Sequence, residues 1–148
     1  MSKFDDLRQE IKILYEDNIH LNEWISAQEQ SNDNQVGEIC KNFLQVLEAF
    51  EWAEATIHER GLDQSKISTS AIARMLTAKT KLLEVLESYG VKKIEFADGV
   101  FDAVKGKIVG TVVDNEKEDG VVANIVRDGF YRKDKLLRMA EVQVVKNN

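Results

Sequence analysis

Three side chains in this sequence carry the reactivity that enzymes and metal sites most often use: Cys40, His20 and His58. Cys40 stands 20 positions after His20 and 18 positions before His58. Metal ligands and nucleophile–base pairs occur at characteristic spacings, and this spacing matches none of them. The sequence also lacks a glycine loop of the P-loop or dinucleotide-binding type. We therefore expect no catalytic centre, no metal site and no cofactor, and the protein is not predicted to be an enzyme.

Charged side chains offer a second kind of chemistry, which is binding. Clusters of acidic residues occur at Asp5, Asp6, Glu116, Glu118 and Asp119. In a chain with net charge −6, such clusters are more typical of solvated faces than of acid–base pairs. A long cation on a β-surface is better suited to binding, because it can pair with carboxylates of a partner, arginine through two parallel hydrogen bonds.

Glycine and proline divide the chain into a helical part and a β-type part. The 148 residues include no proline, so long helices can run without interruption. Only Gly37 and Gly61 occur before residue 90, whereas the other six glycines lie between Gly90 and Gly129. We predict an α+β fold with domains at residues 1–35, 36–90 and 91–148.

The first domain has the apolar spacing of a coiled coil. Apolar residues alternate at intervals of three and four, with one asparagine in the same row: Leu7, Ile11, Leu14, Asn18, Leu21 and Ile25. A buried amide at this kind of position is favoured where it meets the identical amide of a parallel, in-register partner. The pattern predicts a long N-terminal helix in a parallel homodimer. The alternative is an amphipathic helix with one exposed asparagine.

Residues 36–90 have the pattern of two further helices. The polar stretch at 31–35 predicts a break or restart of the first helix, and Gly61 predicts the end of the next. The expected caps are Asp33 or Asn34 at the restart, Ser68 or Ser70 at the following helix, and Gly90 as a left-handed helix end.

The apolar stripes of these two helices are wider than one helical pair can cover. A second copy of the chain would bury the remainder, which predicts a four-helix bundle made of a helical hairpin from each subunit. The residues expected at that interface are Ile39, Phe43, Leu47, Phe50, Leu76 and Leu83.

From residue 91 onward the apolar period is two, which predicts a small β-domain. The expected strands cover residues 93–96, 107–113, 121–126 and 136–145. We expect hairpin turns at the three Asp-Gly steps: Asp98-Gly99, Asp119-Gly120 and Asp128-Gly129. A domain this small buries little surface, so it should lean on the helices.

The C-terminal segment resembles that of one protein family. GrpE proteins end in a Gly-Tyr turn, a few polar residues, an Ile-Arg step and an alternating Val-x-Val strand. The counterparts here are Gly129-Phe130, Leu137-Arg138 and Val142-Gln143-Val144. Residues 90–102 are similar to the family's entry into its β-domain. Four positions depart from the family pattern: Ala103 replaces a proline, Gly106 replaces a histidine, Phe130 replaces the tyrosine of the turn, and Met139 replaces a frequent proline.

This resemblance implies a function and a set of contact residues. GrpE proteins are nucleotide exchange factors that bind the nucleotide-binding domain of a DnaK-type chaperone and promote ADP release by favouring its open cleft. The positions matching the chaperone-contacting β-domain are Phe101, Asp102, Val126, Gly129, Phe130, Lys135, Arg138 and Val144. From residue type alone, Gly129 is most simply a turn residue and Phe130 and Val144 core residues, whereas Lys135 and Arg138 are the stronger contact candidates.

Charge and hydropathy limit the other partners. The net charge of −6 disfavours nucleic acid, whose binding rests on neutralising phosphates. No stretch has the roughly 20 apolar residues of a membrane span and no secretory signal is evident, so we expect a cytoplasmic protein without membrane contact. The alternative function is a coiled-coil dimeric adaptor or scaffold whose β-domain binds an unrelated protein.

Overall fold

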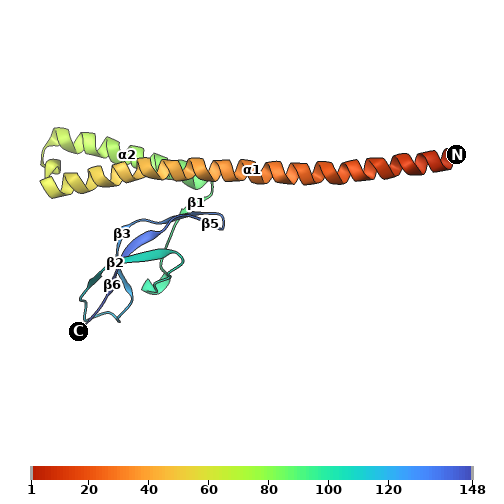
Figure 1. Ribbon diagram of the computed structural model, residues 1–148. Helices are drawn as coiled ribbons and strands as arrows, with labels where there is room; N and C mark the ends of the chain where they lie inside the picture. Colours follow the sequence, from red (N-terminus) through yellow and green to blue (C-terminus); the bar gives the residue numbers. More distant parts are fainter. Residues whose placement is uncertain (1, 148) are drawn as a thin grey trace. The chain divides into compact units, whose positions relative to one another are not determined.

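The computed structural model describes residues 2–147. Two α-helices, α1 (Lys3–Arg60) and α2 (Lys66–Ser88), are joined through the short 3-10 helix η1 (Leu62–Gln64) and precede all six strands (Figure 1). The chain forms two compact units that divide between Glu38 and Ile39. The predicted α+β class is confirmed.

The first unit is the N-terminal part of α1. Ser2 and Asp5 form its cap: the Asp5 N–H donates to Ser2 Oγ (3.3 Å), and the Ser2 N–H donates to Asp5 Oδ2 (3.2 Å). Asn18, whose Oδ1 accepts a hydrogen bond from Asn22 Nδ2 (3.0 Å), is exposed in this chain. The expected break at residues 31–35 is wrong, because every residue from Lys3 to Arg60 is helical. Polar residues lower helix propensity only slightly, and no proline stands there to remove a backbone donor.

The ends of the helices in the second unit follow local chemistry. Gly61 ends α1 in the left-handed conformation (φ 58°), and Gly90 follows α2 with φ 83°, so both predicted glycine stops are confirmed. The N-cap of α2 is Ser65, whose Oγ accepts from the Ser68 N–H (3.1 Å), rather than Ser68 or Ser70. The helix therefore begins a few residues earlier than expected.

Helices α1 and α2 pack as a hairpin at the start of the second unit (Figure 1). Glu54 on α1 forms an ion pair with Lys79 on α2, with 2.5 Å between Oε2 and Nζ. Three leucines on these helices are buried by the chain itself: Leu44, Leu47 and Leu86. The ion pair thus joins the two helices of the hairpin.

The β-domain contains two three-stranded sheets. One sheet has the order β1 (Val91–Lys93), β4 (Phe130–Arg132), β5 (Lys135–Arg138) and is antiparallel. The other has the order β2 (Gly106–Val112), β6 (Ala140–Val145), β3 (Val122–Arg127), in which β2 runs parallel and β3 antiparallel to β6. The buried centre is a cluster made of Ile94, Ala140, Val142 and Val144, with Phe96, Phe101, Val122 and Tyr131 packed against it.

The strand pairing corrects the predicted hairpins. The expected strand at 136–145 is two strands in different sheets, separated at Met139. None of the Asp-Gly steps joins two paired strands. Asp98 and Gly99 form a 3-10 turn, and Gly120 (φ 87°) lies between β2 and β3, which both pair with β6. The tight hairpin is β4–β5, where Lys133 takes the positive φ (52°).

Residue 129 must be glycine because neighbouring atoms leave no room for a Cβ, and not because a turn requires a positive φ. Its φ is not positive, but a Cβ there would overlap the backbone nitrogen of Ala140 and lie 2.8 Å from both Ala140 Cα and Ile94 Cδ1. The Gly129 carbonyl accepts a hydrogen bond from the Ile94 N–H (2.9 Å). The start of β4 and the start of β6 can therefore approach closely only when residue 129 has no side chain.

We expect Gly129→Ala to lower the free energy of unfolding of the β-domain by about 1–3 kcal/mol, the usual cost of overpacking. The effect should not be smaller than this, because backbone atoms cannot move aside as a flexible side chain can. The matched control is Gly110→Ala, whose Cβ would meet only Gln143 side-chain atoms at 3.5 Å. Urea unfolding at one fixed protein concentration measures both changes. Equal stability of the two variants would contradict the close-approach account.

Candidate partner-binding site

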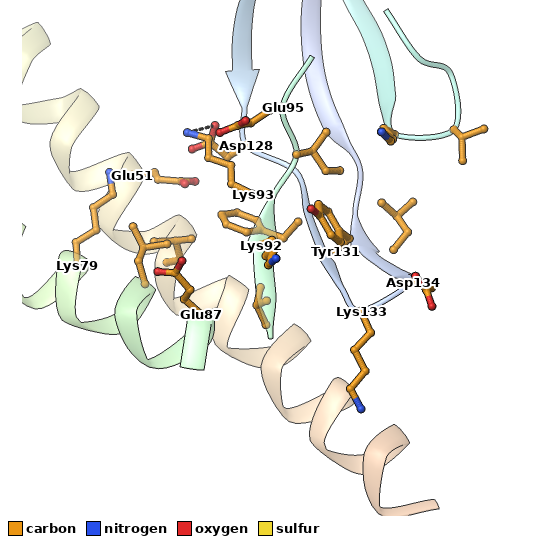
Figure 2. A pocket seen from close by; sticks show the side chains of 18 residues that line it. Glu51, Lys79, Glu87, Lys92, Lys93, Glu95, Asp128, Tyr131, Lys133 and Asp134 are labelled. Atoms are coloured by element: carbon orange, nitrogen blue, oxygen red, sulfur yellow. Dashed lines mark ion pairs between the residues drawn. The ribbon is translucent and has the colours of Figure 1, made fainter. Parts of the chain in front are cut away.

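A groove of about 930 Å³ lies between the helical hairpin and the β-domain (Figure 2). Its apolar lining includes Leu47, Leu83, Val91, Ile94 and Phe130. Charged side chains from both sides surround it, and Lys93 and Asp128 form an ion pair of 2.8 Å. No group of three or more His, Cys, Asp or Glu among residues 2–147 could hold a metal ion.

Cys40 is buried and lies outside this groove. Burial raises the pKa of its thiol, although the positive charge of Arg132 and a backbone hydrogen bond oppose this effect. The thiol therefore stays protonated and has little nucleophilic character near neutral pH. This environment is typical of a cysteine with a structural role in the core.

Arg138 is directed onto α1 instead of outward to a partner. Its Nε donates to the carbonyl oxygen of Asp128 (2.9 Å) and its Nη1 to that of Leu44 (3.5 Å). Its Nη2 lies 3.7 Å from Glu51 Oε2, and the guanidinium carbon stands 5.4 Å from the centre of the Phe130 ring. The expectation of an exposed Arg138 is wrong, because carbonyls and a carboxylate of its own chain surround the cation.

Arg127, which belongs to the other sheet, also contacts α1. Its Nη2 lies 2.5 Å from Glu48 Oε1 on α1, and its Nη1 lies 3.5 Å from Glu141 Oε1 on β6. Glu141 is the residue opposite Arg127 in the β3–β6 register. Strands from both sheets therefore contact α1 through an arginine.

Sequence reasoning did not single out Glu48, Glu51 or Arg127. A signal was available for the two glutamates, which are three residues apart and so share a face of α1 beside the apolar stripe. Nothing in the sequence indicated which cations would meet them. Pairing of Arg127 and Arg138 with one helix depends on strands that are distant in the chain.

Two of the predicted contact residues have exposed side chains. Val126 is 56% exposed at the end of β3, and Lys135 is exposed at the start of β5. Phe101 is half-buried and stacks on Phe96, with 6.2 Å between ring centroids. Asp102 is also half-buried, and its Oδ1 accepts the Val104 N–H (2.9 Å) in a local turn.

The remaining predicted contact residues form the interior. Phe130 and Val144 are buried, which confirms their reading as core residues, and Gly129 is enclosed by Ile94 and Ala140. Pairing of β4 with β5 brings Phe130 opposite Arg138. The structure therefore divides the predicted contact residues into three groups. Val126 and Lys135 are exposed, Phe101 and Asp102 lie in the segment beside Phe96, and the others are inside the fold.

Most residues predicted for a dimer interface are available for one. Leu7, Ile11, Leu14, Leu21, Ile25, Ile39 and Phe43 are exposed. Phe50, Leu76 and Leu83 are half-buried. Leu47 is different, since it is only 1% exposed and its side chain is already covered by its own subunit. Its assignment to the interface is therefore corrected.

The fold defines a class: a helical hairpin that carries a small β-domain. A family model described as GrpE matches residues 3–146. This chain belongs to the GrpE family. Among helices in the described part of the chain, none is long and apolar enough to cross a membrane.

Curated relatives support the same assignment. The GrpE protein of Ehrlichia chaffeensis is 33% identical over 90 residues, which cover 61% of this chain and 44% of that protein. The GrpE protein of Thermoplasma acidophilum is 30% identical over 118 residues, 80% of this chain and 59% of that one. For the GrpE protein of Latilactobacillus sakei the values are 34% over 107 residues, 72% and 51%. The chain spans about half the length of these relatives.

The electrostatic surroundings of Glu51 lead to a pH prediction. Burial raises the pKa of its carboxyl above the ordinary value of 4.5, and the charges of Asp128 and Glu48 add to the rise, while Arg138 and Lys79 oppose it. The folded protein therefore binds this proton more tightly than the unfolded chain. The resulting cost to stability is absent below pH 4.5, grows as the pH rises through the raised pKa, and remains at neutral pH.

We expect Glu51→Gln to unfold at a slightly higher temperature than the wild type at pH 7, because glutamine does not ionise. The difference between the two proteins should vanish as the pH falls to 4.5. Glu54→Gln is the matched control, since it removes the partner of Lys79 and should not raise the midpoint. Thermal unfolding followed by circular dichroism between pH 4 and 8 is the measurement, and a lower midpoint for Glu51→Gln at pH 7 would contradict the prediction.

Proposed function

We propose that this chain is a cytoplasmic nucleotide exchange factor that binds the nucleotide-binding domain of a DnaK-type chaperone as a homodimer. The observation that carries the proposal is the family match, which covers both helices and all six strands. The absence of a metal-binding cluster among residues 2–147 is compatible with a protein that acts by binding.

The proposed mechanism is a shift in the population of chaperone conformations. A factor that binds the open cleft more tightly than the closed one separates the groups that hold ADP, so ADP leaves faster and ATP can enter. By linkage, nucleotide must then weaken binding of the factor by the same ratio. A coupling free energy of about 1–3 kcal/mol corresponds to a 5- to 150-fold change in affinity.

Contact with the chaperone is assigned to the exposed part of the β-domain. Val126 offers an apolar surface and Lys135 a cation that is exposed and lies at the β4–β5 hairpin. Phe101 and Asp102 would shape the neighbouring loop. Gly129, Phe130, Arg138 and Val144 would act through the backbone positions that they maintain.

Support for the proposed dimer comes from apolar residues that are exposed to solvent in a single chain. Leu7, Ile11, Leu14, Leu21 and Ile25 recur at coiled-coil spacing and are exposed along the first unit. A parallel partner would bury them and bring Asn18 against its counterpart. Ile39 and Phe43, in the second unit, are also apolar and exposed.

Stopped-flow release of labelled ADP from the cognate chaperone tests the function. The wild type should accelerate release, and Lys135→Ala should reduce the acceleration by roughly tenfold, the effect of about 1.4 kcal/mol of lost contact. Lys117→Ala is the matched control, because Lys117 is a cation of the same domain in an ion pair with Asp114 far from the β4–β5 hairpin in sequence. Unchanged ADP release in the presence of the wild type would refute the proposal.

Affinity capture from the native cytoplasm separates this function from a coiled-coil adaptor. A chaperone that is bound and then released by ATP supports nucleotide exchange. A different partner that ATP does not release would instead identify an adaptor.

The dimer has its own test in Leu14→Asp. Burial of a leucine stabilises by about 1.5–3 kcal/mol, and a dimer contains two copies, so the dissociation constant should rise by more than about 100-fold. Gln9→Asp is the control, since Gln9 lies outside the apolar row. Sedimentation velocity across a concentration series measures both variants. A wild type that remains monomeric at tens of micromolar would overturn the dimer proposal.

A further inference from the structure

Three consecutive contact points on one face of α1 receive the β-domain. The Leu44 carbonyl, Glu48 and Glu51 are spaced by four and three residues, so they share a helix face. Arg138 from β5 contacts the first and the third, and Arg127 from β3 contacts the second. We call these contacts the arginine clamp.

A second connection between the β-domain and the helices is the chain itself. Helix α2 ends at Ser88, and β1 begins at Val91. Gly90 lies between them in the left-handed conformation, with no atom closer than 4.0 Å to where its Cβ would be. Arg132 Nε donates to the Tyr89 carbonyl oxygen (2.8 Å) across this joint. A domain held at one short joint can swing about it unless a second attachment fixes its angle.

The clamp has the composition of an attachment that can open. Its side chains are long, and the Arg127 Nε and Arg138 Nη2 atoms are buried without a hydrogen-bond partner among the described residues. The separation of 3.7 Å between Arg138 Nη2 and Glu51 permits an ion pair but no hydrogen bond. Such buried donors reduce the net gain from closing the clamp. Opening the clamp should therefore cost less free energy than breaking fully hydrogen-bonded ion pairs would, although the closed arrangement remains the favoured one.

We propose that Arg127 and Arg138 are positioning residues, and that the arginine clamp sets the angle of the β-domain on α1. When the clamp opens, the β-domain swings about Gly90 and the groove of Figure 2 widens. The consequence for ADP release rests on the proposed function, because a β-domain at a variable angle presents Val126 and Lys135 to the chaperone less often in the competent geometry. The affinity of this protein for the chaperone and the rate of ADP release then fall in proportion to the fraction of molecules whose β-domain has the competent angle.

The test measures the angle directly and in the absence of the chaperone. Cysteines introduced by Ile67→Cys on α2 and Glu116→Cys on the β-domain, in a Cys40→Ala background, carry spin labels whose distance distribution is recorded by pulsed electron resonance. Both sites are exposed. Excess unlabelled protein is mixed in, so that each assembly holds at most one labelled chain.

Charge reversal on the helix tests the clamp without altering the proposed chaperone-binding surface. Glu48→Arg places like charges together and should convert a narrow distance distribution into a broad one. Adding Arg127→Glu restores opposite charges and should narrow it again. Glu59→Arg is the matched control, since Glu59 is an exposed glutamate on the same helix, and it should match the wild type. An unchanged distribution in Glu48→Arg would overturn the clamp.

Salt and a milder variant cover the case in which Glu48→Arg does not fold. Raising NaCl from 0.1 to 1 M shortens the screening length from about 10 Å to about 3 Å, so the wild-type distribution should broaden. Glu48→Gln should be broad already at 0.1 M and should change less with salt. Identical salt responses of the two proteins would count against the clamp.

Release of labelled ADP then tests the positioning role. Glu48→Arg should accelerate release at least threefold less than the wild type, and the double variant should recover most of the loss. A broadened distribution with unchanged exchange would remove the positioning role while leaving the clamp. A wild type without exchange activity would refute the proposed function, whereas the distance measurements would still decide whether the clamp exists.

Discussion

The close approach of Gly129 to Ala140 is the constraint on which the β-domain depends. Gly129 precedes β4 in one sheet and Ala140 begins β6 in the other, so their contact joins the two sheets at their starts. Ile94 closes the same point, both through its side chain and through a hydrogen bond from its N–H to the Gly129 carbonyl. Beside this contact, Phe130 is buried opposite Arg138, and Val142 and Val144 belong to the core cluster.

Attachment of the β-domain to the helices has a different physical character from its core. The core consists of aliphatic and aromatic side chains, whereas α1 is reached through the arginine clamp. Apolar packing is non-directional and tolerates little empty space, so it defines a stable domain. Ionic contacts of long side chains are weaker and respond to salt, so they suit an interface whose geometry can change. In the proposed clamp, the β-domain would therefore be rigid inside and adjustable where it meets α1.

The predictions that succeeded are those decided by neighbouring residues. Gly61 and Gly90 end helices because glycine adopts positive φ without steric cost, and that property is local. The α+β division also followed from periodicity and from the glycine distribution. Residue type placed Phe130 and Val144 in the core correctly. Sequence similarity carried the family assignment, which the match over residues 3–146 confirms.

Several of the predictions that failed required knowledge of distant partners. Arg138 was expected at the surface, but its hydrogen-bond acceptors come from Asp128 and from Leu44, which is 94 residues away. One continuous strand was expected at 136–145, yet its two halves pair with different strands. Leu47 was predicted to lie at the interface with a second subunit, although its own chain buries it. By itself the sequence determined the two helix ends at Gly61 and Gly90, the β-character of the C-terminal third and the family, because these depend on local conformational preference and on motif. Only the tertiary structure decided which strands pair and where the arginines point, because those outcomes depend on contacts between residues far apart in the chain.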